Sequence, residues 1–233
     1  MDTVKNTFLS WSSGKDAALA LHKLQQAPDV QVQKLLTSVN RLYKRVTMHG
    51  LREAVLEQQL SALDIPLHKV VLPQQGGMEA YENAMDSAFS QLTAEGITHG
   101  AFGDIFLEDL KTYREKQLQN HQLQALFPLW KQDTQTLIQE FLQLGFEAIT
   151  VAVNGAVLDK SFVGQKVDAT FLERLPKGVD PCGENGEFHT FCYQGPIFKH
   201  PIPYKKGKTI GRTYPDPKGG TPVPYWFCDI LPD

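Results

Sequence analysis

The sequence has little of what would place it in several large classes of protein. Its three cysteines, Cys182, Cys192 and Cys228, are an odd and sparse set, which favours reduced thiols over a disulfide scaffold. No uninterrupted apolar run approaches the length of a membrane span. The first residues lack the basic-then-apolar pattern of a secretory signal. We therefore expect a cytoplasmic protein with no membrane partner.

Neither sign of charge is in large excess, and two common phosphate-binding patterns are missing. The formal net charge is -3 over 233 residues, which gives no basic coat for nucleic acid. Neither the Walker pattern GxxxxGK[ST] nor the dinucleotide pattern GxGxxG occurs. Nucleic acid is therefore not an expected partner, and a bound nucleotide requires another type of loop.

Strand-like and helix-like segments alternate through most of the chain. The expected strands are 6–11, 30–39, 67–72, 100–102 and 148–153, and the expected helices are 15–26, 51–63, 79–95, 106–123 and 133–144. This alternation predicts an α/β fold, in which helices cover both faces of a Rossmann-like, parallel five-stranded sheet.

The composition changes after about residue 158. Glycine and proline become frequent and helical patterns become scarce. We therefore divide the chain into a domain of residues 1–158 and a smaller, loop-rich α+β subdomain of residues 159–233. Within the subdomain, we expect residues 205–224 to form a partly mobile, basic tail.

Parallel sheets bind ligands beyond the carboxyl ends of their strands. The predicted strand order along the chain places 12–16, 37–48, 103–104 and Asn154 on this rim. In the first of these segments, Ser12 and Ser13 offer hydroxyls, Gly14 allows close approach, and Lys15 adds a charge at a helix N-terminus. Such a turn suits a phosphate or pyrophosphate; the alternative is a capped helix start with an exposed lysine.

Further along the chain, Asp104 follows a strand and suits a Mg²⁺ ligand or a substrate-orienting group, or else it caps the next helix. Asp16 likewise caps a helix or holds a metal ion. Arg114 lies on the apolar stripe of the predicted helix, and a buried guanidinium needs an anionic partner. Asp104, Glu108 and a ligand phosphate all remain open as that partner.

The stretch from Cys182 to Thr190 concentrates several reactive side chains. Glu184 and Glu187 could bind a cationic group or ammonia, position Mg²⁺, or accept a proton, and His189 could act as a general base near neutral pH. Two alternatives are open: zinc held by Cys182, His189 and Cys192, and purely structural hydrogen bonding.

Five stretches in order resemble one known family. "SWSSGKDAALALHKL" is similar to the SGGKDS-type pyrophosphate loop of the N-type ATP pyrophosphatases, the adenine-nucleotide alpha-hydrolase superfamily. "TMHGLREAVLEQQLSALDIPLHKV", "GAFGDIFLEDLKTYRE", "FPLW" and "CGENGEFHTFCYQGPIF" resemble segments of its diphthine–ammonia ligase (diphthamide synthase) family. Ser13 and Ala17 depart from the pattern, which usually has glycine and a hydroxyl residue there.

The resemblance implies a HUP-type fold that binds ATP and Mg²⁺. It also implies an enzyme that adenylates a carboxylate, releases pyrophosphate and adds ammonia. The expected catalytic residues are Lys15, Asp104, Glu184, Glu187 and His189. The residues expected to bind ATP are Ser12, Ser13, Gly14, Lys15, Asp16, Thr47, Met48 and Arg114, with the region of Thr47 and Met48 against the adenosine. The expected metal ligands are Asp16 and Asp104.

The family name implies diphthine on an elongation factor as the acceptor, but a different carboxylate stays open. A homodimer is a further possibility. Two other function classes also remain: a tRNA-modifying ATP pyrophosphatase and a non-catalytic adenine-nucleotide-binding module.

Overall fold

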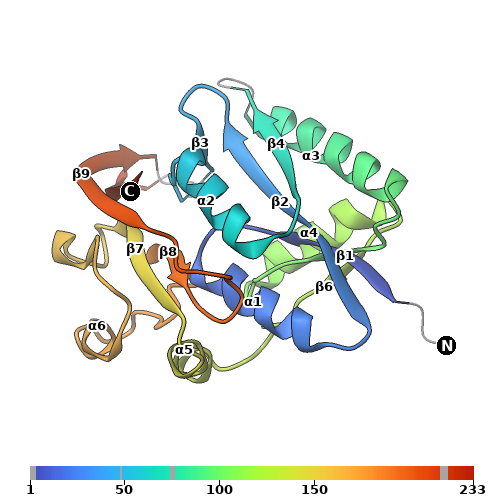
Figure 1. The fold of residues 1–233 in the computed structure, drawn as a ribbon. Coiled ribbons are helices and arrows are strands. Elements are labelled where there is room, and N and C mark those ends of the chain that lie inside the picture. The colour runs from blue at the N-terminus through green and yellow to red at the C-terminus, as the bar shows by residue number, and fades with distance from the viewer. Residues whose placement is uncertain (1–3, 48, 74–76, 216–219) are drawn as a thin grey trace.

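Figure 1 shows the fold of the computed structural model, which describes residues 4–47, 49–73, 77–215 and 220–233. Its elements follow in the order β1 (Lys5–Ser10), α1 (Lys15–Gln26), β2 (Val30–Asn40), β3 (Arg45–Val46), α2 (Glu53–Leu63), β4 (Leu67–Leu72), α3 (Gly77–Ala94), β5 (His99–Ala101), α4 (Glu108–Gln119), β6 (Gln124–Leu126), α5 (Thr134–Gln143), β7 (Glu147–Asn154), η1 (Lys160–Phe162), α6 (Ala169–Glu173), β8 (Phe188–Gln194), β9 (Tyr204–Tyr214) and β10 (Val223–Pro232).

The first sheet, sheet A, confirms the predicted α/β fold. Five strands run parallel in the order β4, β2, β1, β5 and β6, and the short β3 pairs antiparallel with the end of β2. This order places β1 at the centre of the sheet. The turn that follows β1 therefore lies in the middle of the rim where ligands bind.

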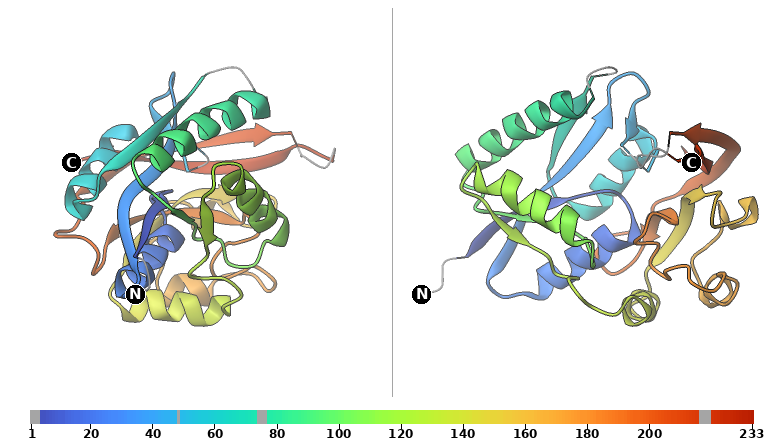
Figure 2. Two further views of the ribbon diagram at one scale, coloured as in Figure 1. Left: turned by 90° about the vertical axis from the view of Figure 1, so that its right-hand side faces the viewer. Right: turned by 180° about the vertical axis from the view of Figure 1, so that it is seen from behind.

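Helices cover both faces of sheet A, as predicted. Successive residues of β1 point to opposite faces, so Phe8 packs with residues of α3 and α4, whereas Leu9 packs with residues of α1 and α2. Figure 2 shows α3 and α4 together on one side of the sheet. None of the helices in the described ranges has the length and apolar character needed to cross a bilayer.

The prediction that residues 148–153 form the fifth parallel strand is wrong. These residues lie in β7, which belongs to a second, antiparallel sheet, sheet B, with the strand order β8, β7, β10 and β9. The six central residues of β7 are all buried. A continuous apolar run fits a strand buried in either type of sheet, so periodicity does not distinguish them. The fifth parallel strand is β6, whose three residues are too few to show a pattern.

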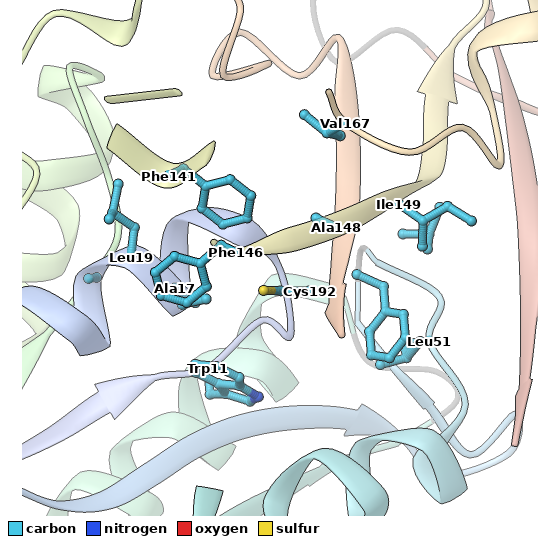
Figure 3. Close-up of a cluster of buried hydrophobic side chains, with 14 of the residues drawn as sticks. Trp11, Ala17, Leu19, Leu51, Phe141, Phe146, Ala148, Ile149, Val167 and Cys192 are labelled. Atoms are coloured by element: carbon cyan, nitrogen blue, oxygen red, sulfur yellow. The ribbon is translucent and has the colours of Figure 1, made fainter. Parts of the chain in front are cut away.

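The two sheets share a core around α1. Figure 3 shows Ala17 and Leu19 of α1 beside Phe141 of α5 and Phe146, with Ala148 of β7 close by. One continuous buried cluster joins these residues to α2, on the same face of sheet A as α1. The strand β7 of sheet B lies before the predicted domain boundary at residue 158. The division of the chain at that residue stays a prediction.

The expected mobile tail at residues 205–224 is mostly ordered strand. Tyr204–Tyr214 and Val223–Pro232 pair antiparallel as β9 and β10, while residues 216–219 lie outside the described part. Most side chains of β9 are exposed because it is the outer strand of sheet B. A strand at a sheet edge tolerates glycine and lysine, which is why its composition resembled that of a loop.

Candidate active site

The turn after β1 brings the start of α1 to the centre of the rim. Ser13 is fully buried and has a φ of +73°, and Gly14 is the residue before the helix. This left-handed conformation favours glycine and costs a residue with a Cβ about 1–2 kcal/mol. That cost explains why the resembled pattern has glycine where this chain has Ser13.

Gly14, the N-cap of α1, has no side chain of its own to cap the helix, but the Thr190 hydroxyl of β8 accepts from the backbone N–H of Lys15 at 3.0 Å. A Cβ placed on Gly14 would lie 3.0 Å from His49 Cε1 and 3.2 Å from the carbonyl oxygen of Thr190, so β8 and the loop after β3 approach closely. The hydroxyl of Ser13 is buried and has no hydrogen-bond partner within the described residues. A positive helix end beside this hydroxyl fits an anion.

Lys15 is not the exposed lysine of the alternative interpretation. Its side chain is 3% exposed, and its ammonium donates to the Asp16 carboxylate at 2.7 and 2.8 Å and to the carbonyl oxygen of Cys182. Burial lowers the pKa of Lys15, but the negative charge of Asp16 outweighs this and holds the pKa above its ordinary value. The structure therefore keeps a fixed positive charge at the start of α1.

Gln59 of α2, which the sequence analysis missed, holds this turn in place. Its amide donates to the carbonyl oxygens of Ser13 at 3.1 Å and Cys192 at 2.7 Å, and its oxygen accepts from Trp11 Nε1 at 2.9 Å. Gln59 is fully buried and lies on the apolar face of α2 with Val55. A polar residue within an apolar helical stripe was the available signal, because a buried amide requires partners.

The end of β5 lies directly against α1. A Cβ on Gly103 would be 3.0 Å from the carbonyl carbon of Asp16, so only a glycine fits there without a shift. Asp104 accepts from Arg114 Nε at 2.5 Å, and the guanidinium of Arg114 lies 4.4 Å from the centre of the Phe102 ring. The partner of Arg114 in this structure is therefore Asp104.

The segment from 180 to 187 folds over the same rim. Glu187 is buried, and its Oε1 accepts from the backbone of Asp180 and from Asn185, both at 3.1 Å. Glu184 accepts from the backbone N–H of Ile105 at 2.8 Å. Burial, with the nearby charges of Asp16 and Asp104, raises the pKa of Glu184 to about 7. The carboxylate of Glu184 therefore lies near enough to Asp16 and Asp104 for their charges to affect its pKa. Glu187 instead is buried within the loop and accepts hydrogen bonds from it.

Two histidines meet beside Gly14. The rings of His49 and His189 are 4.7 Å apart, and His49 Nδ1 lies 3.2 Å from the carbonyl oxygen of Thr190. Burial lowers the pKa of His49 to about 3 and that of His189 to about 4, so both rings are neutral at pH 7. Burial and the nearby Lys15 charge favour the neutral ring of His189, and its role as a general base stays a prediction. His49 was not selected as a site residue because nothing in the sequence pairs it with His189.

Ser12 and Thr47 also lie near this site, with contacts to the backbone. The Ser12 hydroxyl accepts weakly from the backbone N–H of Gly14 at 3.4 Å, and the Thr47 hydroxyl donates to the carbonyl oxygen of Ser38 at 3.2 Å. Met48, expected beside the adenosine, lies outside the described residues.

Family models match both parts of the chain. The diphthamide synthase N-terminal domain matches residues 5–124, and the diphthamide synthase C-terminal domain matches residues 133–213. The chain belongs to the diphthamide synthase family. The N-terminal match includes the β1–α1 turn, Asp104 and Arg114, and the C-terminal match includes the segment that carries Glu184 and His189.

Curated relatives agree with this family. The chain is 35% identical over 114 residues to a diphthine–ammonia ligase of Bos taurus and 33% identical over 114 residues to that of Homo sapiens, in each case over 46% of this chain and 41% of the relative. It is 32% identical over 126 residues to a diphthine–ammonia ligase of Danio rerio, over 52% of this chain and 48% of the relative. The match therefore spans less than half the length of these relatives.

The arrangement of the thiols does not favour the zinc alternative. Cys182 Sγ lies 3.4 Å from the carbonyl oxygen of Thr134, and Cys192 Sγ lies 3.6 Å from that of Gln194. Across the described ranges, no group of three or more histidine, cysteine or acidic residues could hold a metal ion. Mg²⁺ held by Asp16 and Asp104 stays a prediction.

We expect acid to destabilise the protein through the histidine pair. Both folded-state pKa values lie below the ordinary 6.5, so below about pH 6.5 the unfolded chain binds more protons and stability falls with pH. His49→Gln should therefore reduce the decrease in Tm between pH 6.5 and pH 4.5. His200→Gln, an exposed position, is the control and should keep the wild-type slope. An equal decrease in Tm for His49→Gln and wild type over this pH range would contradict the conclusion that both histidines are neutral in the folded protein.

Proposed function

We propose that this protein is an ATP-dependent ligase that adenylates a carboxylate and then replaces the AMP with ammonia. The observation that carries the proposal is the buried Lys15 ammonium at the start of α1, together with the hydroxyl of Ser13, which has no partner within the described residues. A helix end, a fixed cation and a hydroxyl donor are the groups that stabilise a leaving pyrophosphate. Membership of the diphthamide synthase family supports ATP use.

The chemistry requires activation because a carboxylate oxygen is a poor leaving group. In the first step a carboxylate oxygen attacks the α-phosphorus of ATP, and the bond to the β-phosphate oxygen breaks to release pyrophosphate. In the second step ammonia attacks the acyl carbon, AMP leaves, and one proton is lost to a base. The products are an amide, AMP, pyrophosphate and a proton.

The residues around the turn have distinct proposed roles. The loop Ser12–Gly14 binds pyrophosphate with its hydroxyls and backbone, and Lys15 neutralises the charge that develops on it. Asp16 and Asp104 would hold Mg²⁺, in keeping with the preference of this ion for one or two carboxylates in nucleotide sites. Arg114 would orient Asp104, to which it donates at 2.5 Å. The chemistry that Mg²⁺ would supply there is polarisation of the phosphate oxygens.

Glu184 is the proposed base of the second step. Its pKa of about 7 matches the operating pH, which is the condition for efficient proton transfer. His49 and His189, neutral at pH 7, would accept hydrogen bonds from ammonium and hold it near the site. Glu187 would act by shaping the loop that carries Glu184.

The proposed acceptor is a carboxylate on a protein such as an elongation factor. The curated relatives are named for diphthine and ammonia, and this name supports a protein-bound acceptor with ammonium as the second substrate. A cytoplasmic location and a homodimer remain predictions of the sequence.

We expect the purified protein, with ATP, Mg²⁺, ammonium and a protein extract, to form AMP and pyrophosphate in equal amounts. The reason is that cleavage next to the α-phosphate releases both products in one step. Thin-layer separation of α-labelled ATP distinguishes AMP from ADP. ADP as the product, or no ATP binding by calorimetry, would overturn the proposed function.

A further inference from the structure

The loop after β3 carries His49 to the start of α1. Arg45 and Arg52 bridge as an antiparallel pair at its two ends. We name this segment the 45–52 loop; its described residues are 45–47 and 49–52. His49 Cε1 lies 3.0 Å from a Cβ placed on Gly14, so the ring packs directly on the turn before α1. The position of the 45–52 loop therefore decides how closely His49 covers that turn.

A single carboxylate, that of Asp229 in β10, holds both ends of the 45–52 loop. It accepts from Arg45 Nη1 at 2.9 Å, and from Arg52 Nε at 3.0 Å and Nη2 at 2.6 Å. Arg45 Nη1 also donates to the carbonyl oxygen of Gly50 at 2.6 Å. Paired hydrogen bonds between a guanidinium and a carboxylate fix orientation as well as distance. The loop is therefore fastened to β10 at both ends.

An irregularity in sheet B lies at Asp229. The pairing of β9 and β10 shifts register between Cys228 and Ile230, so Gly207 and Lys208 lie opposite Asp229 alone. A Cβ on Gly207 would lie 3.1 Å from that of Asp229, so the two strands approach closely here. A β-bulge of this kind bends the pairing and redirects side chains next to it. The outer hairpin is thus shaped at the residue that holds the loop.

The contacts of Asp229 keep it charged but add little to the stability of the fold. Burial raises the pKa of Asp229, but hydrogen bonds from Arg52 and Arg45 outweigh this and hold the pKa below its ordinary value. The side chains of Arg45 and Arg52 are 32% and 43% exposed, and ion pairs as exposed as these contribute about 1 kcal/mol or less. Their main effect is therefore on the position of the loop.

Sheet B holds the 45–52 loop at a second place. The ring of His189, on β8, lies 4.7 Å from that of His49. Asp229 and the histidine contact thus fix the loop from two different strands. Without the charge of Asp229 only one of these attachments remains, and the loop can pivot about it. Such a shift moves His49 relative to Gly14, on which it packs.

We propose that Asp229 is a positioning residue for ATP binding: it fixes the 45–52 loop so that His49 closes one side of the turn at Gly14. The match to the family models ends at residue 213, so family membership assigns no role to Asp229. The inference rests on the proposed ligase function, which supplies the nucleotide. It adds that β10, from outside the turn, sets the affinity for that nucleotide.

The test compares Asp229→Asn with wild type, both as the full chain. Without nucleotide, hydrogen–deuterium exchange followed by mass spectrometry should show the 45–52 loop exchanging about 10-fold faster, because local opening becomes easier. A loop that is in place about a tenth of the time raises the calorimetric Kd for ATP about 10-fold. The kcat for AMP formation at saturating ATP should change less than about 2-fold, because bound nucleotide selects the same loop position.

Glu147→Gln is the matched control. Glu147 is also a partly buried carboxylate of sheet B, and it accepts from Tyr193 at 2.7 Å and pairs with Lys166 at 2.9 Å, neither of which belongs to the loop. This variant should keep the wild-type exchange of the loop and the wild-type Kd for ATP. Arg52→Gln is the second test variant, in case Asp229→Asn does not fold. It removes an exposed side chain, leaves Arg45 on Asp229, and should raise both quantities by a smaller factor.

Each outcome decides the role of Asp229. Faster loop exchange together with a higher Kd for ATP, in the test variants and not in Glu147→Gln, supports it. Unchanged exchange overturns it, and so does faster exchange with an unchanged Kd; the ligase function stands in both cases. Equal effects in Glu147→Gln also overturn it, because they show a general loosening of sheet B. If wild type binds no ATP, the ligase function fails and this role fails with it.

Discussion

Lys15→Met is expected to lower the rate of AMP formation by about 10²–10³-fold, the effect of removing one charged donor from a site of developing charge. Lys15 is buried at the start of α1, where its ammonium lies against Asp16. Methionine fills a similar volume and carries no charge. The measurement is kcat/KM for AMP formation at pH 7.

The same substitution also has a structural cost, so it needs a control. The Cys182 carbonyl and the Asp16 carboxylate lose a hydrogen-bond donor, which lowers the free energy of unfolding by about 1–3 kcal/mol. Rates must therefore be compared at a temperature below that at which the variant begins to unfold. Lys23→Met lies on the same helix and removes a surface ion pair with Glu140, so its stability should change by less than about 1 kcal/mol. An undiminished rate in Lys15→Met would remove Lys15 from the mechanism.

Gln59→Leu is expected to lower the free energy of unfolding by about 2–4 kcal/mol. Leucine fits the apolar face of α2 but leaves the Trp11 indole N–H without its partner and removes one hydrogen bond from each of the carbonyl oxygens of Ser13 and Cys192. Each is buried, so each loses a hydrogen bond that water does not replace. Urea unfolding measures the change, and AMP formation should also fall because the turn loses its support.

The control for this prediction is the preceding residue of the same helix. Gln58 is half-buried, and its side-chain oxygen has no hydrogen-bond partner in the part of the chain that the structure describes. Gln58→Leu should therefore change the free energy of unfolding by less than about 0.5 kcal/mol. Equal losses for the two variants would mean that packing in α2, and not the Gln59 hydrogen bonds, controls stability.

Local patterns predicted most of sheet A and the centre of the site. The strand, the small polar turn and the helix around Ser12–Lys15 are each visible in a few consecutive residues, and all three occur in the structure. The apolar stripe that placed Arg114 in a half-buried position also follows from helical spacing. Asp104 was one of three alternative partners for Arg114, and only the tertiary structure shows that the two residues form a hydrogen bond.

Contacts between distant segments were not predicted in the same way. His49 and His189 are separated by 140 positions, and nothing local to either shows that their rings meet. The lowered pKa of each ring follows from burial by distant segments, so no local pattern in the sequence predicts it. Gln59 is a similar case, because its partners come from the turn after β1 and from β8.

The sequence by itself determined the α/β alternation, the family and the small polar turn between β1 and α1, because these depend on residue spacing within single segments. Only the tertiary structure decided that β7 belongs to sheet B, since a buried apolar strand has the same pattern in either sheet. It also decided that Lys15 is enclosed by Asp16 and Cys182. These properties depend on which segments meet, and strand pairing is not encoded in any one of them.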